Sequence, residues 1–322
     1  MNEGAIRRRT FLAGAAALTA SGALAPGEGR AQTGVPNSSG TEPAKVKAPA
    51  NAADCHIHIY DPRFPQATPR PGRIPTNATV ADYRLLQKRN GTTRVVVVTP
   101  RNYGTDNRVT VDALTQFGAS ARGIAVLHPD VADAELKALD GAGIRGIRFT
   151  LGDPATAVVR WDMVEPLAKR VAGLGWHLQF NLDGQQVVDN ADLLGRLPTQ
   201  LVFDHMGHPT LPAGVDHASH RVIRGLIDKG RTWVKLSGAY SNTKVGPPAY
   251  PDATAIAQAF VKAAPERLVW GSDWPHPGEQ NKPELPNDAL LFDLLAVWAP
   301  DEATRSRILV ENPEQLYGFA KG

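Results

Sequence analysis

The sequence predicts a parallel (β/α)8 barrel, also called a TIM barrel, on three observations. From Ala52 onwards, short runs rich in β-branched residues alternate with longer amphipathic runs, which is the pattern of a parallel α/β fold. Eight such strand–helix units follow one another before the chain ends at residue 322, which matches the usual size of this barrel. No glycine-rich loop follows Val98, as the competing doubly wound nucleotide-binding sheet would require.

The expected strands are short and almost wholly apolar, because both faces of a barrel sheet are buried. They cover Asp54–Ile59, Arg94–Thr99, Gly123–Leu127, Gly146–Phe149, Trp176–Asn181, Leu201–Asp204, Thr232–Leu236 and Leu268–Gly271. The expected helices lie between and after them, near residues 80–90, 107–119, 131–141, 161–174, 185–195, 217–229, 251–264 and 287–310. The barrel domain is therefore expected to span residues 52–322.

Residues 1–31 have the composition of a signal peptide for export. Arg7, Arg8 and Arg9 precede Thr10 and an uncharged, alanine-rich run, and the order Arg-Arg-Thr-Phe-Leu is typical of a twin-arginine signal. The apolar run is too short and too rich in Ala and Gly for a membrane anchor, which needs about 20 apolar residues. We expect cleavage after Ala25 or Ala31 and a periplasmic or secreted protein.

Removal of this leader would leave an almost neutral chain. The segment carries four arginines and two glutamates, so its loss lowers the formal net charge from +3 to +1. The basic balance therefore gives no support for nucleic acid or a membrane as a partner, and a small-molecule substrate is expected. Residues 32–51 contain Pro, Ser, Gly, Lys and Ala without periodicity, which predicts a flexible linker. The sequence leaves the oligomeric state open.

Polar residues cluster where the expected strands end, and in a barrel the carboxyl ends of the strands form the active-site face. His56 and His58 lie on the first strand, His205 follows the sixth, and Asp273 follows the eighth. The first and eighth strands become neighbours when a barrel closes. We therefore expect these four residues to form the catalytic site.

Strict alternation along the first strand predicts which residues face the barrel mouth. Asp54, His56 and His58 would share the inner face, whereas Cys55 and the neighbouring isoleucines would face the helix layer. Cys55 is the single cysteine, so no internal disulfide can form. On this geometry we expect Cys55 to be a small buried apolar residue and not a metal ligand.

These motifs together resemble the amidohydrolase superfamily of metal-dependent hydrolases. The order of His-x-His on strand one, His on strand six and Asp on strand eight is the arrangement of that superfamily. The likeness extends to the branch that contains 2-pyrone-4,6-dicarboxylate lactonase and sugar-acid lactonases. It runs through Ala52–Pro65, Tyr103–Asn107, Ala121–Val126, Arg145–Phe149, Phe203–Gly207 and Val269–Pro277. The resemblance implies a barrel hydrolase that opens a lactone.

The resemblance also bears on metal content. Two-metal members of the superfamily carry a carboxylated Lys or a Glu on strand four and a His at the end of strand five. Here strand four offers only Ile147–Thr150, and strand five ends at Asn181, with His177 expected low in the barrel as a structural residue. A binuclear centre is therefore not expected. The lactonase branch works without a metal, so we expect no cofactor. The alternative is one divalent cation, zinc or manganese, on His56, His58 and Asp273.

The expected metal-free mechanism assigns a role to each of the four residues. Asp273 would act as the general base that activates water, and His56, His58 and His205 would stabilise the oxyanion. One alternative is a mononuclear metal-dependent hydrolase or decarboxylase. Another is a binding protein on an inactive barrel, which would have no need to keep all four residues.

Arg148, at the end of strand four, predicts a carboxylated lactone or a sugar acid as the substrate, because guanidinium grips carboxylate bidentately. Arg101, Tyr103 and Tyr240 are expected to line the same pocket. The dicarboxylate-specific relatives carry further arginines after strands four and seven. This sequence has Thr150–Pro154 and Ala239–Asn242 there, so we do not expect pyrone dicarboxylate itself. His276 is expected to support Asp273, and Asp204 to orient His205 or to cap the following loop.

Overall fold

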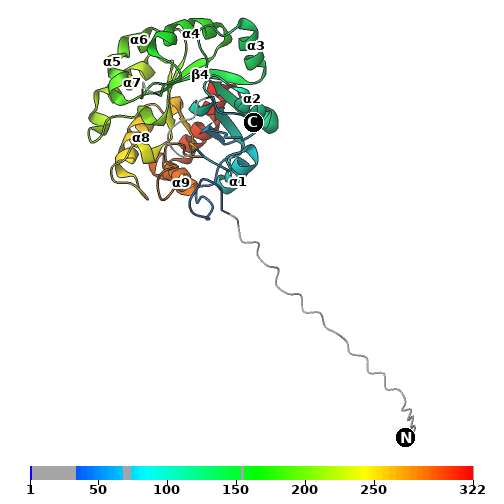
Figure 1. Ribbon diagram of the computed structural model, residues 1–322. Helices are drawn as coiled ribbons and strands as arrows, with labels where there is room; N and C mark the ends of the chain where they lie inside the picture. Colours follow the sequence, from blue (N-terminus) through cyan, green and yellow to red (C-terminus); the bar gives the residue numbers. More distant parts are fainter. Residues whose placement is uncertain (2–33, 68–73, 154–155, 322) are drawn as a thin grey trace. The chain divides into compact units, whose positions relative to one another are not determined.

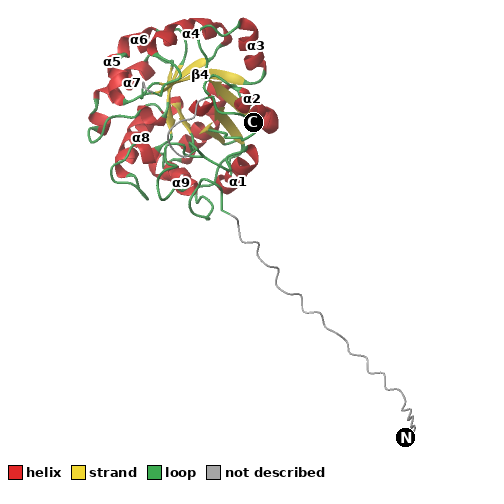
Figure 2. Cartoon of the chain, in the orientation of Figure 1, coloured by secondary structure: helices red, strands yellow, loops and turns green. Residues whose placement is uncertain are grey.

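The computed structural model describes Met1 and residues 34–67, 74–153 and 156–321. Eight parallel strands form one sheet in the order β1 to β8, and the helices surround them (Figures 1 and 2). The strands are β1 (Ala53–Ile57), β2 (Arg94–Val98), β3 (Ala121–Ala125), β4 (Ile144–Thr150), β5 (His177–Asn181), β6 (Leu201–Phe203), β7 (Thr232–Leu236) and β8 (Leu268–Trp270). The predicted TIM barrel is confirmed.

The barrel closes where the chain leaves β8 and meets β1. The backbone N–H of Asp273 donates to the carbonyl of His56 at 2.8 Å, and the N–H of His58 donates to the carbonyl of Trp274 at the same distance. Gly271 lies at this seam, where a Cβ atom would stand 2.6 Å from the Cβ of His56. The seam therefore joins the histidine strand to the aspartate loop, as predicted from closure.

The outer layer consists of helices that match the predicted spans closely over most of the chain. They are α1 (Val80–Asn90), α2 (Arg108–Phe117), α3 (Asp133–Gly141), α4 (Val164–Val171), α5 (Gly184–Asp189), α6 (Ala191–Arg196), α7 (Ala218–Asp228), α8 (Pro251–Ala263), α9 (Asp288–Trp298), α10 (Glu302–Ser306) and α11 (Asn312–Tyr317). No helix of the described residues is long and apolar enough to cross a membrane.

The single helix predicted over 287–310 is wrong, because the chain breaks at Pro300. Proline lacks a backbone N–H and disfavours helical geometry in the residue before it. Ala299 is accordingly non-helical, with φ −131° and ψ 81°. The Asp301 side chain then caps a new helix by accepting from the N–H of Thr304 at 2.8 Å.

Residues 34–51 pack against the barrel, which corrects the expectation of a flexible linker. Trp274 donates its indole N–H to the carbonyl of Pro36 at 2.7 Å, and Arg89 donates to the carbonyl of Glu42 at 2.8 Å. The backbone N–H groups of Lys45 and Val46 donate to the Asp293 carboxylate. This segment has no helix or strand, so its polar backbone is satisfied by the barrel helices instead. The predicted signal peptide lies outside the described residues.

The interior of the barrel is apolar near the amino ends of the strands and polar at their carboxyl ends. The inner apolar cluster includes Val96, Ile124, Val202, Trp233 and Val269, and it extends to Leu316, Tyr317 and Phe319 near the C-terminus. A larger apolar cluster lies between the sheet and the helices. Polar side chains are thus concentrated at the mouth.

Candidate active site

A β-bulge in β1 brings both histidines toward the mouth. Asp54 pairs with Val95 but Ile57 pairs with Val97, so β1 holds one extra residue between them. The bulge breaks strict alternation. Asp54 therefore points outward, where Tyr83 of α1 donates to it at 3.1 Å, and Cys55 joins the inner apolar cluster. The predicted faces of Asp54 and Cys55 were wrong, whereas those of His56 and His58 are confirmed.

The four predicted catalytic residues meet at one point. Nε2 of His56 lies 3.3 Å from Nε2 of His58 and 3.5 Å from Oδ1 of Asp273. The same Asp273 oxygen lies 3.3 Å from Nε2 of His58 and 3.9 Å from Nε2 of His205. All four residues are buried, with exposures of 0% for His56, 2% for His58, 5% for His205 and 7% for Asp273.

Two of these residues hold left-handed backbones, with φ +49° at His205 and φ +63° at Asp273. Such geometry costs about 1–3 kcal/mol in a non-glycine residue and persists only where its surroundings enforce it. At Asp273 the bonds across the seam do this. At His205 the backbone that follows β7 packs directly against the imidazole ring. A Cβ at Gly238, which itself has φ +61°, would lie 2.8 Å from the ring Nδ1.

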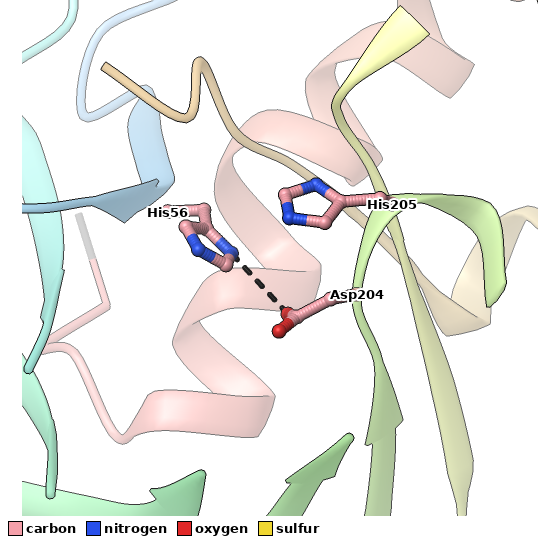
Figure 3. A group of neighbouring side chains, drawn as sticks. All are labelled: His56, Asp204 and His205. Carbon is pink, nitrogen blue, oxygen red and sulfur yellow. Dashed lines mark ion pairs between the residues drawn. The ribbon is translucent and has the colours of Figure 1, made fainter. Parts of the chain in front are cut away.

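A buried charge network lies directly beneath the histidines. Figure 3 shows His56 facing Asp204, with His205 beside it; Nδ1 of His56 is 3.2 Å from Oδ1 of Asp204. Arg148 and Gln179 each donate to the other oxygen, at 3.0 and 3.1 Å. Burial alone would raise the pKa of Asp204, but His56, Arg148 and Lys235 outweigh it and hold this pKa well below its usual range. Asp204 is therefore ionised, and it contacts His56, not His205 as expected.

Sequence reasoning missed Lys235 and Gln179. Lys235 lies on β7, and its Nζ donates to Gln179 at 2.8 Å. Both side chains are fully buried. Burial lowers the pKa of Lys235 to about 8, with the Asp204 carboxylate opposing the shift. A lysine inside the otherwise apolar run Thr232–Leu236 was the available signal, since lysine is almost never fully buried without a partner.

A second chain of hydrogen bonds supports Asp273 from the other side. The Tyr240 hydroxyl donates to Oδ2 of Asp273 and lies 3.1 Å from Nδ1 of His276, whose Nε2 lies 3.0 Å from Oδ2 of Asp288. Burial opposes the charge on His276, but the Asp288 carboxylate raises its pKa. The Asp288 carboxylate can only accept and the Tyr240 hydroxyl gives its proton to Asp273, so these contacts need a donor at both His276 nitrogens. The expected support of Asp273 by His276 runs through Tyr240.

The pocket above these residues has a volume of about 430 Å³. Its walls include His58, His205, Asp273, Arg148 and Arg101, together with Tyr60, Asn102, Asn181, His208 and Asn281. Two larger hollows on the molecule contain none of the four catalytic residues. Volume is therefore a poorer guide to this site than the cluster of ionisable groups.

The two predicted tyrosines do not line this pocket. Tyr103 is buried, and its hydroxyl accepts from the N–H of Asp61 at 3.1 Å, with its ring beside Tyr60. Tyr240 is used to hold Asp273. Tyr60 occupies the wall instead.

The protonation states suit Asp273 as a base. Burial would raise the pKa of Asp273, but the facing His205, His58 and His56 hold it well below its usual range. Burial lowers the pKa of His205 and, more strongly, that of His56. At neutral pH the site therefore presents the Asp273 carboxylate beside the neutral imidazoles of His205 and His56.

The spacing of His56, His58 and Asp273 suits one metal ion, but the proton positions do not. Ligands of a tetrahedral zinc ion at 2.0–2.1 Å would be roughly 3.3 Å apart, close to what is found. A ligating imidazole nitrogen must carry a lone pair. Nδ1 of His56 lies 3.3 Å from Nζ of Lys235, and an ammonium can only donate. This contact favours a His56 proton on Nε2, and a protonated Nε2 does not fit a metal ligand.

Comparison with known proteins identifies the family. The family model described as amidohydrolase matches residues 53–319, which is nearly the whole barrel. The chain belongs to the amidohydrolase family. It is therefore an enzyme, as its site geometry also indicates.

Relatives within the family act on cyclic esters. A 2-pyrone-4,6-dicarboxylate hydrolase of Comamonas testosteroni is 35% identical over 85% of this chain and 92% of its own. A 4-sulfomuconolactone hydrolase of Rhizobium radiobacter is 33% identical over 89% of this chain and 98% of its own. A D-galactarolactone isomerase of Agrobacterium fabrum is 31% identical over 87% of this chain and 94% of its own. The resemblance predicted from the motifs is confirmed.

Proposed function

We propose that this enzyme hydrolyses an acidic lactone without a metal cofactor. The observation that carries the proposal is the carboxylate of Asp273, held ionised in the lining of the pocket beside three imidazoles. The names of the three relatives support the lactone as substrate class. Lactone hydrolysis needs one base for water and one donor for the carbonyl oxygen, and both are present.

Asp273 takes the proton from water as the water oxygen attacks the lactone carbonyl. The tetrahedral intermediate then collapses, the ring C–O bond breaks, and protonated Asp273 returns the proton to the leaving alkoxide. Positioned general bases contribute about 10²–10⁴-fold to such rates. Tyr240 donates to the carboxylate oxygen that does not face the histidines, so it orients Asp273 for this transfer.

The three histidines contribute unequally to oxyanion stabilisation. His205 lines the pocket, and Ser237 lies 2.9 Å from its Nδ1; donation by this hydroxyl leaves Nε2–H directed at the mouth. His58 also lines the pocket, but its Nδ1 donates to the Val98 carbonyl at 2.8 Å and its Nε2 faces Nε2 of His56 at 3.3 Å, so it is not assigned to the oxyanion. His56 has no exposed surface and acts through its neighbours. We therefore assign the oxyanion chiefly to His205.

The positive wall of the pocket favours an anionic substrate. Arg101 and Arg148 both line it, and burial together with the neighbouring Arg148 lowers the pKa of Arg101. An Asp204 oxygen holds Nε of Arg148, which fixes the guanidinium plane against the pocket. A carboxylated or sulfonated lactone, or a sugar-acid lactone, would neutralise these charges. The wall has fewer arginines than the dicarboxylate-specific relatives are expected to carry, so pyrone dicarboxylate is not the proposed substrate.

Export through a twin-arginine signal is also part of the proposal. It rests on Arg8 and Arg9 before the alanine-rich run. The observed barrel is consistent with a route used by proteins that fold before export, and the enzyme would then meet its lactone in the periplasm or outside the cell.

The test is a panel of neutral and carboxylated lactones, with ring opening followed by NMR. The wild-type enzyme is expected to open acidic lactones, and Asp273→Asn should lower turnover by about 10²–10⁴-fold while leaving the fold intact. Asp130→Asn, an exposed carboxylate after β3, serves as the control and should retain full activity. An enzyme that opens no lactone, or an Asp273→Asn variant that retains turnover, would refute the proposal.

A further inference from the structure

Lys235 is a fully buried lysine that does not touch the pocket, yet it contacts the catalytic cluster from below. Its Nζ lies 2.8 Å from Oε1 of Gln179, 3.3 Å from Nδ1 of His56 and 3.6 Å from Oδ1 of Asp204. An ammonium offers three donors and no acceptor. Nδ1 of His56 can bond to it only with a lone pair, which puts the ring proton on Nε2.

The contact between the two β1 histidines leads independently to the same tautomer. Nδ1 of His58 lies 2.8 Å from the carbonyl of Val98, and a carbonyl can only accept, so this nitrogen carries the proton. Where the His58 ring carries a single proton, Nε2 is then a lone pair. Since Nε2 of His56 lies 3.3 Å away, it must carry a proton, or two lone pairs would face each other.

One contact favours the opposite tautomer, namely Oδ1 of Asp204 at 3.2 Å from Nδ1 of His56. The ring geometry decides against it: Oδ1 is close to the His56 ring but accepts no well-aligned hydrogen bond from the described residues, so the ring N–H does not point at it. The Asp273 oxygen, 3.5 Å from Nε2 of His56, adds a further acceptor on the other side. Three contacts therefore favour a proton on Nε2 and one favours Nδ1.

We propose that Lys235 is a positioning residue that locks His56 as the Nε2–H tautomer and thereby keeps a metal ion out of the site. The donors then run in one direction, from Lys235 to His56, from His56 to His58, and from His58 to Val98. This proposal rests on the proposed lactone hydrolysis only for what the arrangement serves, which is to hold the His58 ring in place beside the Asp273 base.

Removal of the lysine donors should convert the cluster into a metal site. In Lys235→Met, Nδ1–H of His56 is free to turn to Oδ1 of Asp204, a buried acceptor that the lysine would no longer contact. A carboxylate–histidine pair of this kind is what orients metal-binding imidazoles in other proteins. Nε2 of His56 would then offer a lone pair beside His58 and Asp273.

The first experiment reads the tautomer of His56 in the wild-type enzyme and uses a variant only to assign the signals. The imidazole nitrogens are labelled with ¹⁵N, and the His56 resonances are assigned by their loss in His56→Asn. We expect a pyridine-type Nδ1 and a pyrrole-type Nε2. The reverse pattern would overturn the proposal, whether or not the enzyme opens lactones. Absence of lactone turnover with the expected pattern would refute only the proposed function.

The second experiment measures zinc affinity by calorimetry at neutral pH. Lys235→Met is expected to bind zinc about 10–100-fold more tightly than the wild type, the usual size of effects from groups that orient metal-binding histidines. Lys262→Met, which replaces an exposed lysine on α8, should match the wild type. Equal zinc affinity in folded Lys235→Met and wild-type enzyme would contradict the proposal. If Lys235→Met does not fold, the wild-type spectrum decides.

Discussion

Substitution of Asp54 by Asn should stabilise the barrel at neutral pH and not in acid. Asp54 sits at the seam, where its Oδ1 accepts from the N–H of Ser272 at 2.9 Å and of His56 at 3.2 Å, while Tyr83 donates to Oδ2. Burial raises the pKa of this carboxyl from 3.8 to about 6. Asn keeps the two backbone contacts through its carbonyl oxygen, and its amide can donate to the Tyr83 oxygen in place of the lost carboxylate contact.

The sign and size of the effect follow from linkage. A carboxyl whose folded-state pKa is raised stabilises the fold below the unfolded pKa, and this contribution is lost as pH rises through the folded pKa. The shift of about two units corresponds to about 3 kcal/mol, lost mainly between pH 4 and pH 6. The variant has no such group, so its free energy of unfolding relative to the wild type should rise by about 3 kcal/mol across this window.

Urea unfolding, monitored by circular dichroism at pH 3.5 and pH 7.5, measures the difference in the free energy of unfolding between Asp54→Asn and the wild type. Asp228→Asn, an exposed carboxylate at the end of α7, is the matched control and should show no such pH-dependent gain. The free energy of unfolding of Asp54→Asn relative to wild type should rise with pH. A value that stays constant or falls as pH rises would refute the assignment of Asp54 as a buried, desolvated carboxyl.

Three further substitutions test the supports of the site. Tyr240→Phe removes a hydrogen bond to the Asp273 carboxylate that is worth about 1.5–3 kcal/mol. The acid limb of the pH profile of kcat/KM should therefore move up by about one to two pH units. An unchanged limb would contradict the contact. Arg148→Ala should raise KM for acidic lactones about tenfold or more and spare neutral ones, whereas equal losses would make Arg148 purely structural. Gly238→Ala places a Cβ 2.8 Å from the His205 ring, so turnover should fall and Tm should drop; wild-type kinetics would show that the ring moves freely.

The barrel and the catalytic quartet were predictable because both depend on local patterns. Apolar runs such as Val95–Val98 fix strand positions, and closure puts the ends of β1 and β8 together whatever the loops do. The break after α9 was also readable, since Pro300 carries its own signal. The prediction of one helix over 287–310 nevertheless ran through it.

The remaining errors arise from tertiary contacts that no local pattern encodes. The bulge in β1 has no glycine or other sequence mark, yet it reverses the faces of Asp54 and Cys55. Residues 34–51 lack periodicity, but their backbone is satisfied by Arg89, Asp293 and Trp274 far along the chain. The path from Tyr240 through His276 to Asp288 likewise joins residues whose proximity only the fold creates.

Lactone turnover by metal-stripped wild-type enzyme tests most directly whether Asp273 and the three histidines suffice for catalysis. The enzyme is dialysed against a chelator, its metal content is measured, and kcat/KM on the best acidic lactone is compared with that of untreated enzyme. We expect the stripped enzyme to have the same kcat/KM as untreated enzyme while holding well under one metal ion per chain. Loss of turnover on chelation, restored by stoichiometric zinc or manganese, would contradict it.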